Sequence, residues 1–202
     1  MNFIKLDGED ILPSKIVCIG RNYVDHIKEL DNEVPTEPII FIKPNSAISS
    51  DVYFNEMDAV HFEGEISFLV RSGKLFAVGF GLDLTKRDVQ SKLKANGLPW
   101  ERAKAFNKSA IFSEFVSFDS VSGLKMELYI NGSLAQKAGY DLMLHKPDSI
   151  LNEVDNLFSL EDGDLIMTGT PKGVGAVRIG DTFLGKIFEN ERLIVEGCWV
   201  VK

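Results

Sequence analysis

Short apolar runs alternate with turn-forming residues along this chain, and the pattern predicts a strand-rich fold with few helices. The clearest run covers residues 60–70, where aromatic, aliphatic and β-branched residues alternate with His61, Glu63, Glu65 and Ser67. Side chains along a strand point alternately to its two faces. The run therefore predicts a strand with an apolar face and a polar face, and the polar face carries two neighbouring carboxylates.

The same signals predict the remaining elements. Further strands are expected at residues 16–19, 39–42, 75–81, 125–130, 165–168, 182–187 and 191–200, and helices at residues 23–30, 85–94 and 149–156. Thr85 and Asp88 have the spacing of a helix-capping pair, and Asn131-Gly132 predicts a hairpin turn. Because no repeat and no long linker divides the chain, we expect one catalytic domain over residues 1–202.

Composition narrows the classes of partner. The chain is 45% hydrophobic and 26% charged, with a formal net charge of -8, which argues against nucleic acid as a partner. No apolar run approaches the roughly 20 residues of a membrane span, and the N-terminus lacks the apolar segment of a signal peptide. We therefore expect a soluble cytoplasmic protein without a membrane partner, in which Cys18 and Cys198 are buried free thiols.

Two interpretations of Glu63 and Glu65 are equally compatible with their own segment. They are scattered charges on a solvent-facing strand, or they are ligands of a divalent cation that offsets their mutual repulsion. A hairpin turn at residues 71–74 would place Asp83 opposite Phe62, within a residue or two of the glutamates. A cluster of three carboxylates favours Mg²⁺ or Mn²⁺. His61 could be a fourth ligand, but we expect it rather to lie behind the ligands or in the substrate pocket.

Three other segments carry candidate chemistry. His26 and Glu29 are three residues apart on an expected helix, so the carboxylate can orient the imidazole as a general base, although exposed helices often carry such pairs. Lys104 stands among small and aromatic residues, where an ammonium would stabilise an enolate if it were confined and would otherwise be exposed. Residues 168–175 form a glycine-rich loop that could bind an anion but lacks the spacing of a nucleotide-binding loop.

Taken together, these segments resemble the fumarylacetoacetate hydrolase superfamily, in particular its single-domain acylpyruvase and oxaloacetate decarboxylase-like branch. The residues that carry the resemblance are 20–29, 41–44, 61–65, 82–90, 102–106 and 168–175, in the order found in that family. The resemblance implies a β-rich α+β fold, a mixed β-sandwich roll. It also implies Mg²⁺ or Mn²⁺ as cofactor, held by Glu63, Glu65 and Asp83, and a homodimer as the assembly.

The resemblance further implies roles for six residues outside the metal ligands. His26 and Glu29 would activate water, Lys104 would stabilise the enolate, and Arg87, Gln90 and Thr170 would contact substrate oxygens. The implied partner is a small 2-oxo acid, whose carboxylate and keto oxygens suit a hard metal.

We therefore predict a metal-dependent hydrolase that cleaves the C–C bond of acylpyruvates and other 2,4-diketo acids. An oxaloacetate decarboxylase, an oxaloacetate keto–enol tautomerase and a 2-hydroxyhepta-2,4-diene-1,7-dioate-type isomerase are alternatives, because enolate stabilisation serves all three. A non-catalytic metal-binding scaffold is the alternative outside enzymes.

Overall fold

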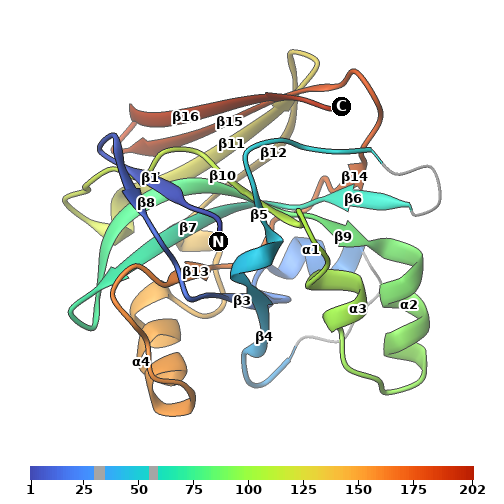
Figure 1. Ribbon diagram of the computed structural model, residues 1–202, viewed down its shortest axis with the longest axis horizontal. Coiled ribbons are helices and arrows are strands. Elements are labelled where there is room, and N and C mark those ends of the chain that lie inside the picture. Colours follow the sequence, from blue (N-terminus) through green and yellow to red (C-terminus); the bar gives the residue numbers. More distant parts are fainter. Residues whose placement is uncertain (30–34, 55–58) are drawn as a thin grey trace.

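The computed structural model describes residues 1–29, 35–54 and 59–202 (Figure 1). Its largest sheet is mixed, because β13 runs parallel to β3 and β5 parallel to β10, while the other neighbours are antiparallel. The strands of this sheet, in spatial order, are β4 (Ile39–Pro44), β3 (Lys15–Gly20), β13 (Leu165–Met167), β7 (Gly64–Arg71), β8 (Lys74–Asp83), β10 (Ala110–Phe112) and β5 (Ile48–Ser49).

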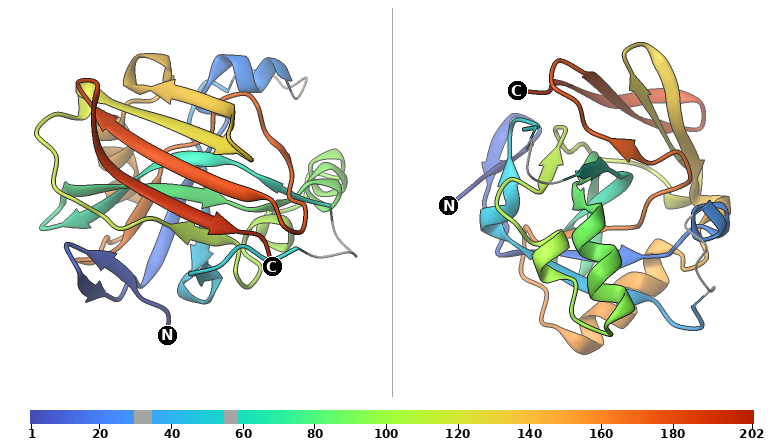
Figure 2. Two further views of the ribbon diagram at one scale, coloured as in Figure 1. Left: turned by 90° about the horizontal axis from the view of Figure 1, so that it is seen from above. Right: turned by 90° about the vertical axis from the view of Figure 1, so that its right-hand side faces the viewer.

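A second, antiparallel sheet lies over the first along the upper side of Figure 1, and Figure 2 shows it from above. It contains β12 (Ser133–Gly139), β11 (Leu124–Ile130), β15 (Thr182–Glu189) and β16 (Arg192–Val200). Two small sheets complete the strands: β14 (Gly175–Ala176) with β6 (Val60–Phe62) and β9 (Thr85–Lys86), and β1 (Ile4–Leu6) with β2 (Glu9–Ile11).

Helices lie around the large sheet and not between the sheets (Figure 1). They are α1 (Val24–Glu29), α2 (Arg87–Ala95), α3 (Glu101–Lys104) and α4 (Pro147–Leu157), with 3-10 turns η1 (Asn45–Ala47), η2 (Val121–Gly123) and η3 (Tyr140–Leu142). Helix α4 covers an apolar patch of the large sheet through Ile150 and Val154, whereas α2 and α3 stand together beside β9. Among the described residues, no helix is long and apolar enough to cross a membrane.

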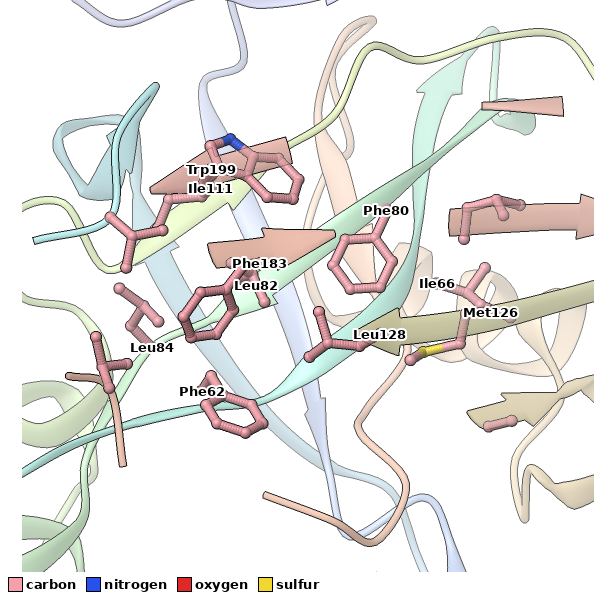
Figure 3. Packing of buried hydrophobic residues seen from close by; sticks show 14 of the residues in the cluster. Phe62, Ile66, Phe80, Leu82, Leu84, Ile111, Met126, Leu128, Phe183 and Trp199 are labelled. Carbon is pink, nitrogen blue, oxygen red and sulfur yellow. The ribbon is translucent and has the colours of Figure 1, made fainter. Parts of the chain in front are cut away.

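The main core fills the space between the two large sheets (Figure 3). Phe62 meets Phe183 edge to face, with ring centroids 5.2 Å apart, and Phe80 from β8 lies 6.1 Å from Trp199 of β16. Burial of such aromatic pairs is a major favourable contribution to folding. The expected α+β class and the mixed β-sandwich roll are both confirmed.

The segment over residues 60–70 is not one continuous strand. It divides at Glu63 into β6 and β7, which belong to different sheets, and the backbone N–H of Gly64 donates to Gln136 Oε1 at 2.8 Å. Asp83 pairs with Glu63 and not with Phe62, since its N–H donates to the Glu63 carbonyl at 2.8 Å. A β-bulge between Leu69 and Val70 shifts the register by one residue and brings the third carboxylate closer than the sequence predicted.

The predicted cap of the second helix is wrong. Thr85 lies in β9, and α2 begins at Arg87 after Lys86, which makes no side-chain capping hydrogen bond. The Thr85 hydroxyl instead accepts a hydrogen bond from Lys104 Nζ at 2.7 Å. The hydroxyl belongs to the polar site described below, so it does not cap the helix.

Most of the remaining sequence predictions are confirmed, and one of the two predicted buried cysteines is exposed. The other strands and helices lie within a few residues of their expected places, and Asn131-Gly132 forms the turn between β11 and β12. Residue 30, the expected last residue of the first helix, is outside the described residues. Cys18 is a buried free thiol as expected, but Cys198 is exposed, because alternate residues of β16 face outward from the second sheet.

Candidate active site

Three buried carboxylates form a cluster where β6, β7 and β8 meet. Glu63 stands at the junction of β6 and β7, Glu65 follows in β7, and Asp83 ends β8. One oxygen from each lies within 4.8 Å of the others, and their exposed fractions are 5%, 1% and 1%. The hairpin pairing and the two-residue alternation of β7 thus place all three side chains on one side of the sheet.

Three cationic side chains face this cluster. Lys104 Nζ bridges it, lying 2.8 Å from Glu63 Oε2 and 2.6 Å from Asp83 Oδ2. The fully buried Lys43 Nζ lies 2.8 Å from Asp83 Oδ1, and the Arg87 guanidinium donates to Glu63 Oε1. Burial makes each charge costly unless an opposite charge is adjacent, so the cluster is held by mutual compensation.

This arrangement moves the protonation equilibria of its members in opposite directions. Burial acts to raise the pKa of Glu63, but Lys104 and Arg87 outweigh it and hold that pKa well below its ordinary value. Burial likewise acts to lower the pKa of Lys104, yet Asp83 and Glu63 raise it above its ordinary value. Glu65 differs, because burial and the charges of Asp83 and Glu63 raise its pKa well above the usual range.

The loop after β13 supplies a backbone donor to the cluster. The N–H of Gly169 donates to Glu65 Oε2 at 2.7 Å, and Gly169 has a φ of 93°, in the left-handed region that favours glycine. A Cβ at this position would lie 2.9 Å from Asn22 Cβ and 3.0 Å from the carbonyl oxygen of Ile19. Only glycine fits, which explains one glycine of the predicted anion-binding loop.

The donor set fits a hard divalent cation. Three carboxylates converge from one side, and carboxylate oxygen is the ligand that Mg²⁺ and Mn²⁺ prefer. The raised pKa of Glu65 shows that burial and its carboxylate neighbours outweigh the nearby cation and backbone donor. A divalent cation would compensate the buried Glu65 carboxylate, so the three residues could hold a metal.

The predicted base pair lies on the short helix α1. His26 Nδ1 is 3.1 Å from Glu29 Oε2, and both Glu29 oxygens accept from the N–H of Gly173, at 3.0 and 3.2 Å. Lys172 adds an ion pair of 3.0 Å to Asp25 at the start of the helix. The glycine-rich loop therefore fixes the helix, and through Glu29 it fixes the orientation of the imidazole.

A single pocket joins these groups. All predicted site residues line it except Glu65 and Glu29, and Glu29 contacts the lining residue His26. The lining residues are Ile19, Gly20, Arg21, His26, Phe41, Glu63, Asp83, Arg87, Gln90, Lys94, Trp100, Lys104 and Thr170. Gln90 accepts a hydrogen bond from Arg87 at 2.7 Å. The Thr170 hydroxyl donates to the Gly64 carbonyl at 2.9 Å and accepts from Gln136 Nε2 at 2.9 Å.

Two contributors to the site were not predicted, and one residue expected near the metal or in the substrate pocket does not line the pocket. Lys43 lies within residues 41–44, which carry the family resemblance, but no role was predicted for it, although a lysine inside an apolar strand indicates burial against a carboxylate. Gln136, whose side chain bonds Gly64 and Thr170, gave no local signal. His61 pairs with Thr85 and Ala176 in the small sheet, and in the described parts of the chain it belongs neither to the acidic cluster nor to the pocket lining.

Sequence comparison identifies the family. A model of the fumarylacetoacetate (FAA) hydrolase C-terminal family matches residues 15–196. The chain belongs to this family. This family includes enzymes.

Three relatives illustrate the similarity. The mitochondrial oxaloacetate tautomerase FAHD1 of Rattus norvegicus is 39% identical over 82% of this chain and 83% of that protein. The crystal structure of a fumarylacetoacetate isomerase/hydrolase-type protein from Oleispira antarctica is 34% identical, with a TM-score of 0.95 and full coverage of both chains. The fumarylpyruvate hydrolase of Pseudomonas aeruginosa, crystallised with Mn²⁺ and pyruvate, is 25% identical, with a TM-score of 0.87 over 100% of this chain and 96% of that one.

Proposed function

We propose that this protein is a divalent-metal-dependent enzyme that forms and protonates the enolate of a 2-oxo acid, with oxaloacetate keto–enol tautomerisation as its main reaction. The observation that carries the proposal is the buried cluster of Glu63, Glu65 and Asp83 with the ammonium of Lys104 beside it. Relatives named as oxaloacetate tautomerases move our preference from the hydrolysis predicted from sequence to this alternative.

The metal would be held by the three carboxylates of the cluster. When bound, a divalent cation supplies positive charge that polarises a keto group and stabilises the negative charge of an enolate. Mn²⁺ in the Pseudomonas relative supports Mg²⁺ or Mn²⁺ as the cofactor of this chain.

The chain's own residues account for the proton transfers. A proton on His26 Nδ1, donated to Glu29, leaves the lone pair on Nε2 that a general base requires. His26 would take a proton from carbon 3 of oxaloacetate and return it to the oxygen on carbon 2, which balances the tautomerisation. Lys104, whose pKa is raised by Asp83 and Glu63, stays protonated and donates to the oxygen that becomes negative.

Acylpyruvate hydrolysis is the second candidate, and the oriented His26 favours it because the same base can deprotonate water. Hydroxide would then add to carbon 4 and the bond between carbons 3 and 4 would break. The electron pair of the broken bond would stay with the pyruvate fragment, which takes up a proton at carbon 3. The fumarylpyruvate hydrolase relative supports this candidate.

Several broader predictions accompany the proposal. The family match over residues 15–196 supports one catalytic domain for the chain. The isomerase alternative and the homodimer stay predictions, as does the cytoplasmic location, since the rat relative is mitochondrial. The scaffold alternative is disfavoured because a structural metal site does not require the His26–Glu29 pair in the same pocket.

The proposal is tested with purified protein loaded with Mg²⁺ or Mn²⁺. Loss of the enol absorbance of oxaloacetate is followed together with pyruvate formation in a coupled assay, and acetylpyruvate is assayed in parallel. We expect faster equilibration of the enol without matching pyruvate release, and loss of that effect in Glu63→Gln. Pyruvate release from oxaloacetate would instead indicate decarboxylation, release from acetylpyruvate would indicate hydrolysis, and no turnover of either substrate would contradict the proposal.

A further inference from the structure

A ring of three buried hydrogen bonds closes around Gly64, the residue that separates Glu63 from Glu65. The N–H of Gly64 donates to Gln136 Oε1 at 2.8 Å, and Gln136 Nε2 donates to the Thr170 hydroxyl at 2.9 Å. That hydroxyl donates in turn to the Gly64 carbonyl at 2.9 Å. Both backbone polar groups of Gly64 are therefore bonded to side chains, at the point where the chain passes from one sheet to another.

The Gln136 side chain makes a third contact, which uses the second hydrogen of its amide. Gln136 Nε2 donates to the Pro171 carbonyl at 2.8 Å, and the residue is only 1% exposed. A reversed amide would set Nε2 against the N–H of Gly64 and the amide oxygen against the Pro171 carbonyl, so the hydrogen bonds fix a single orientation. Gln136 thus holds Gly64 and the loop after β13 in one relation to each other.

Close packing against β12 limits any other placement of this loop. Gly173 has a φ of 97°, and a Cβ there would lie 2.2 Å from the carbonyl oxygen of Ala135, the residue before Gln136. A Cβ on Gly64 would lie 3.0 Å from Gln136 Oε1 and 3.0 Å from the Phe80 ring. β12 therefore approaches the loop at two successive residues, and it binds Gly64 through the second of them.

Both segments joined in this way act on Glu65. Gly64 precedes Glu65 in the chain, so the orientation of its peptide groups determines the direction in which that carboxylate leaves the strand. The loop supplies the N–H of Gly169, which donates to Glu65 Oε2 at 2.7 Å. On the other side of Gly64, the Glu63 carbonyl accepts from the N–H of Asp83 at 2.8 Å. A displacement of Gly64 would therefore disturb the relative positions of all three carboxylates.

We propose that Gln136 is a positioning residue for the metal: by holding the loop of residues 168–175 against Gly64, it keeps Glu63 and Glu65 in the arrangement that binds the divalent cation. The inference rests on the proposed function for the metal site, and it adds a residue of the second sheet that sets the metal affinity. Gln136 does not line the pocket, so a change in metal affinity on its replacement has to act through Gly64 and the loop.

The test measures Mn²⁺ affinity by calorimetry in the absence of substrate, on protein whose folded fraction is determined by circular dichroism. Gln136→Met removes the amide with little change of volume, and Thr170→Val opens the same ring at its other side chain. The double variant Gln136→Met/Thr170→Val shows whether the two residues act as one unit.

Asn45→Leu is the matched control. Asn45 makes the same kinds of contact, since its Oδ1 accepts from the N–H of Asn2 at 2.8 Å and its Nδ2 donates to the carbonyls of Asn2 and Pro13 at 2.8 and 2.9 Å. It lies in η1, outside the pocket lining. The loss of an amide that joins two segments is therefore compared at the site and away from it.

We expect Gln136→Met and Thr170→Val each to weaken Mn²⁺ binding about tenfold, the lower end of the loss typical when a residue that supports metal ligands is changed. The double variant should lose about as much as either single variant, because the first substitution already opens the ring. Asn45→Leu should lower the free energy of unfolding and leave Mn²⁺ affinity unchanged.

Unchanged Mn²⁺ affinity in Gln136→Met, fully additive losses in the double variant, or an equal loss in Asn45→Leu would overturn the assignment. If Gln136→Met does not fold, Thr170→Val decides, and unchanged Mn²⁺ affinity in that variant would overturn the assignment as well.

The outcomes separate this inference from the proposed function. Mn²⁺ binding that depends on Gln136 in a protein without turnover of any 2-oxo acid would contradict the proposed reaction and leave the positioning role standing. Turnover of oxaloacetate with a Mn²⁺ affinity unaffected by Gln136→Met would contradict the positioning role and leave the reaction standing. No Mn²⁺ binding by the unmodified chain would overturn both.

Discussion

Two buried carboxylates in this protein, Asp164 and Glu65, have opposite surroundings. Asp164, at the entrance to β13, accepts hydrogen bonds from the N–H groups of Ser14, Lys15 and Glu161, from the Ser14 hydroxyl and from the Lys15 ammonium. Burial acts to raise the pKa of Asp164, but these donors hold it below the ordinary range. Its negative charge is therefore already satisfied by the protein.

Glu65 shows the reverse. Its side chain is as inaccessible to solvent as that of Asp164, yet burial and the neighbouring charges of Asp83 and Glu63 raise its pKa, and the N–H of Gly169 does not reverse that effect. The difference separates a carboxylate that joins chain segments from one that is positioned for a ligand. Burial of a charge alone does not distinguish structure from function, whereas the completeness of its partners does.

Glu65→Gln should produce the largest effect, because it removes one of three anionic ligands while leaving an amide of nearly the same shape. We expect Mn²⁺ affinity to fall by more than about 100-fold, which exceeds the loss typical for mutation of a residue that only hydrogen-bonds to a metal ligand. The loss of turnover should be comparable or larger. Calorimetric titration with Mn²⁺ measures the first and the enol assay measures the second.

Asp164→Asn is the matched control for that experiment, since it neutralises an equally buried carboxylate outside the site. It should leave Mn²⁺ affinity and the rate per folded molecule unchanged. A loss of Mn²⁺ affinity in Asp164→Asn similar to that in Glu65→Gln would show that the two carboxylates do not differ as proposed.

Glu29 is intermediate between Asp164 and Glu65, and its substitution should produce the second-largest effect. It accepts two contacts from the Gly173 N–H, as a structural carboxylate would, and it also contacts His26. Glu29→Gln should lower kcat about 10- to 100-fold and His26→Gln about 10²- to 10⁴-fold, because general-base catalysis depends on the oriented imidazole. Steady-state kinetics at saturating metal measure both, and unchanged Mn²⁺ affinity is expected; an unaltered kcat in His26→Gln would exclude its role as the base.

Much of this site follows from local sequence rules. Alternation along residues 60–70 places Glu63 and Glu65 on one face, and the turn after residue 71 returns Asp83 to within one residue of its observed partner. The three-residue spacing of His26 and Glu29 likewise predicts their contact on a helix. These features depend on residues close in the chain or joined by a short hairpin, for which geometry is nearly fixed.

Other features depend on contacts that no local pattern contains. The bulge between Leu69 and Val70 and the change of sheet at Glu63 interrupt a run whose alternation continues through both points. The Lys43 side chain meets Asp83 although the strands β4 and β8 are not neighbours in the sheet, and Asp164 binds residues about 150 positions earlier. Such contacts are set by the tertiary fold, which is why the sequence indicated the metal ligands but neither the buried lysine nor the structural aspartate.

Asp164→Asn should have the smallest effect, and it acts on stability. An amide cannot accept all the hydrogen bonds that the carboxylate accepts, so we expect the free energy of unfolding at neutral pH to fall by about 1–3 kcal/mol. A carboxylate whose folded pKa is lowered adds stability above its unfolded pKa, about 3.9, and that stability is lost as the pH falls through the folded pKa. The difference in unfolding free energy between the unmodified chain and Asp164→Asn should therefore be full at neutral pH and shrink below about pH 4, as measured by urea unfolding.

Asp155→Asn is the control, at an exposed position on α4, and its unfolding free energy should equal that of the unmodified chain at every pH. A difference for Asp164→Asn that widened in acid would contradict the account of its charge.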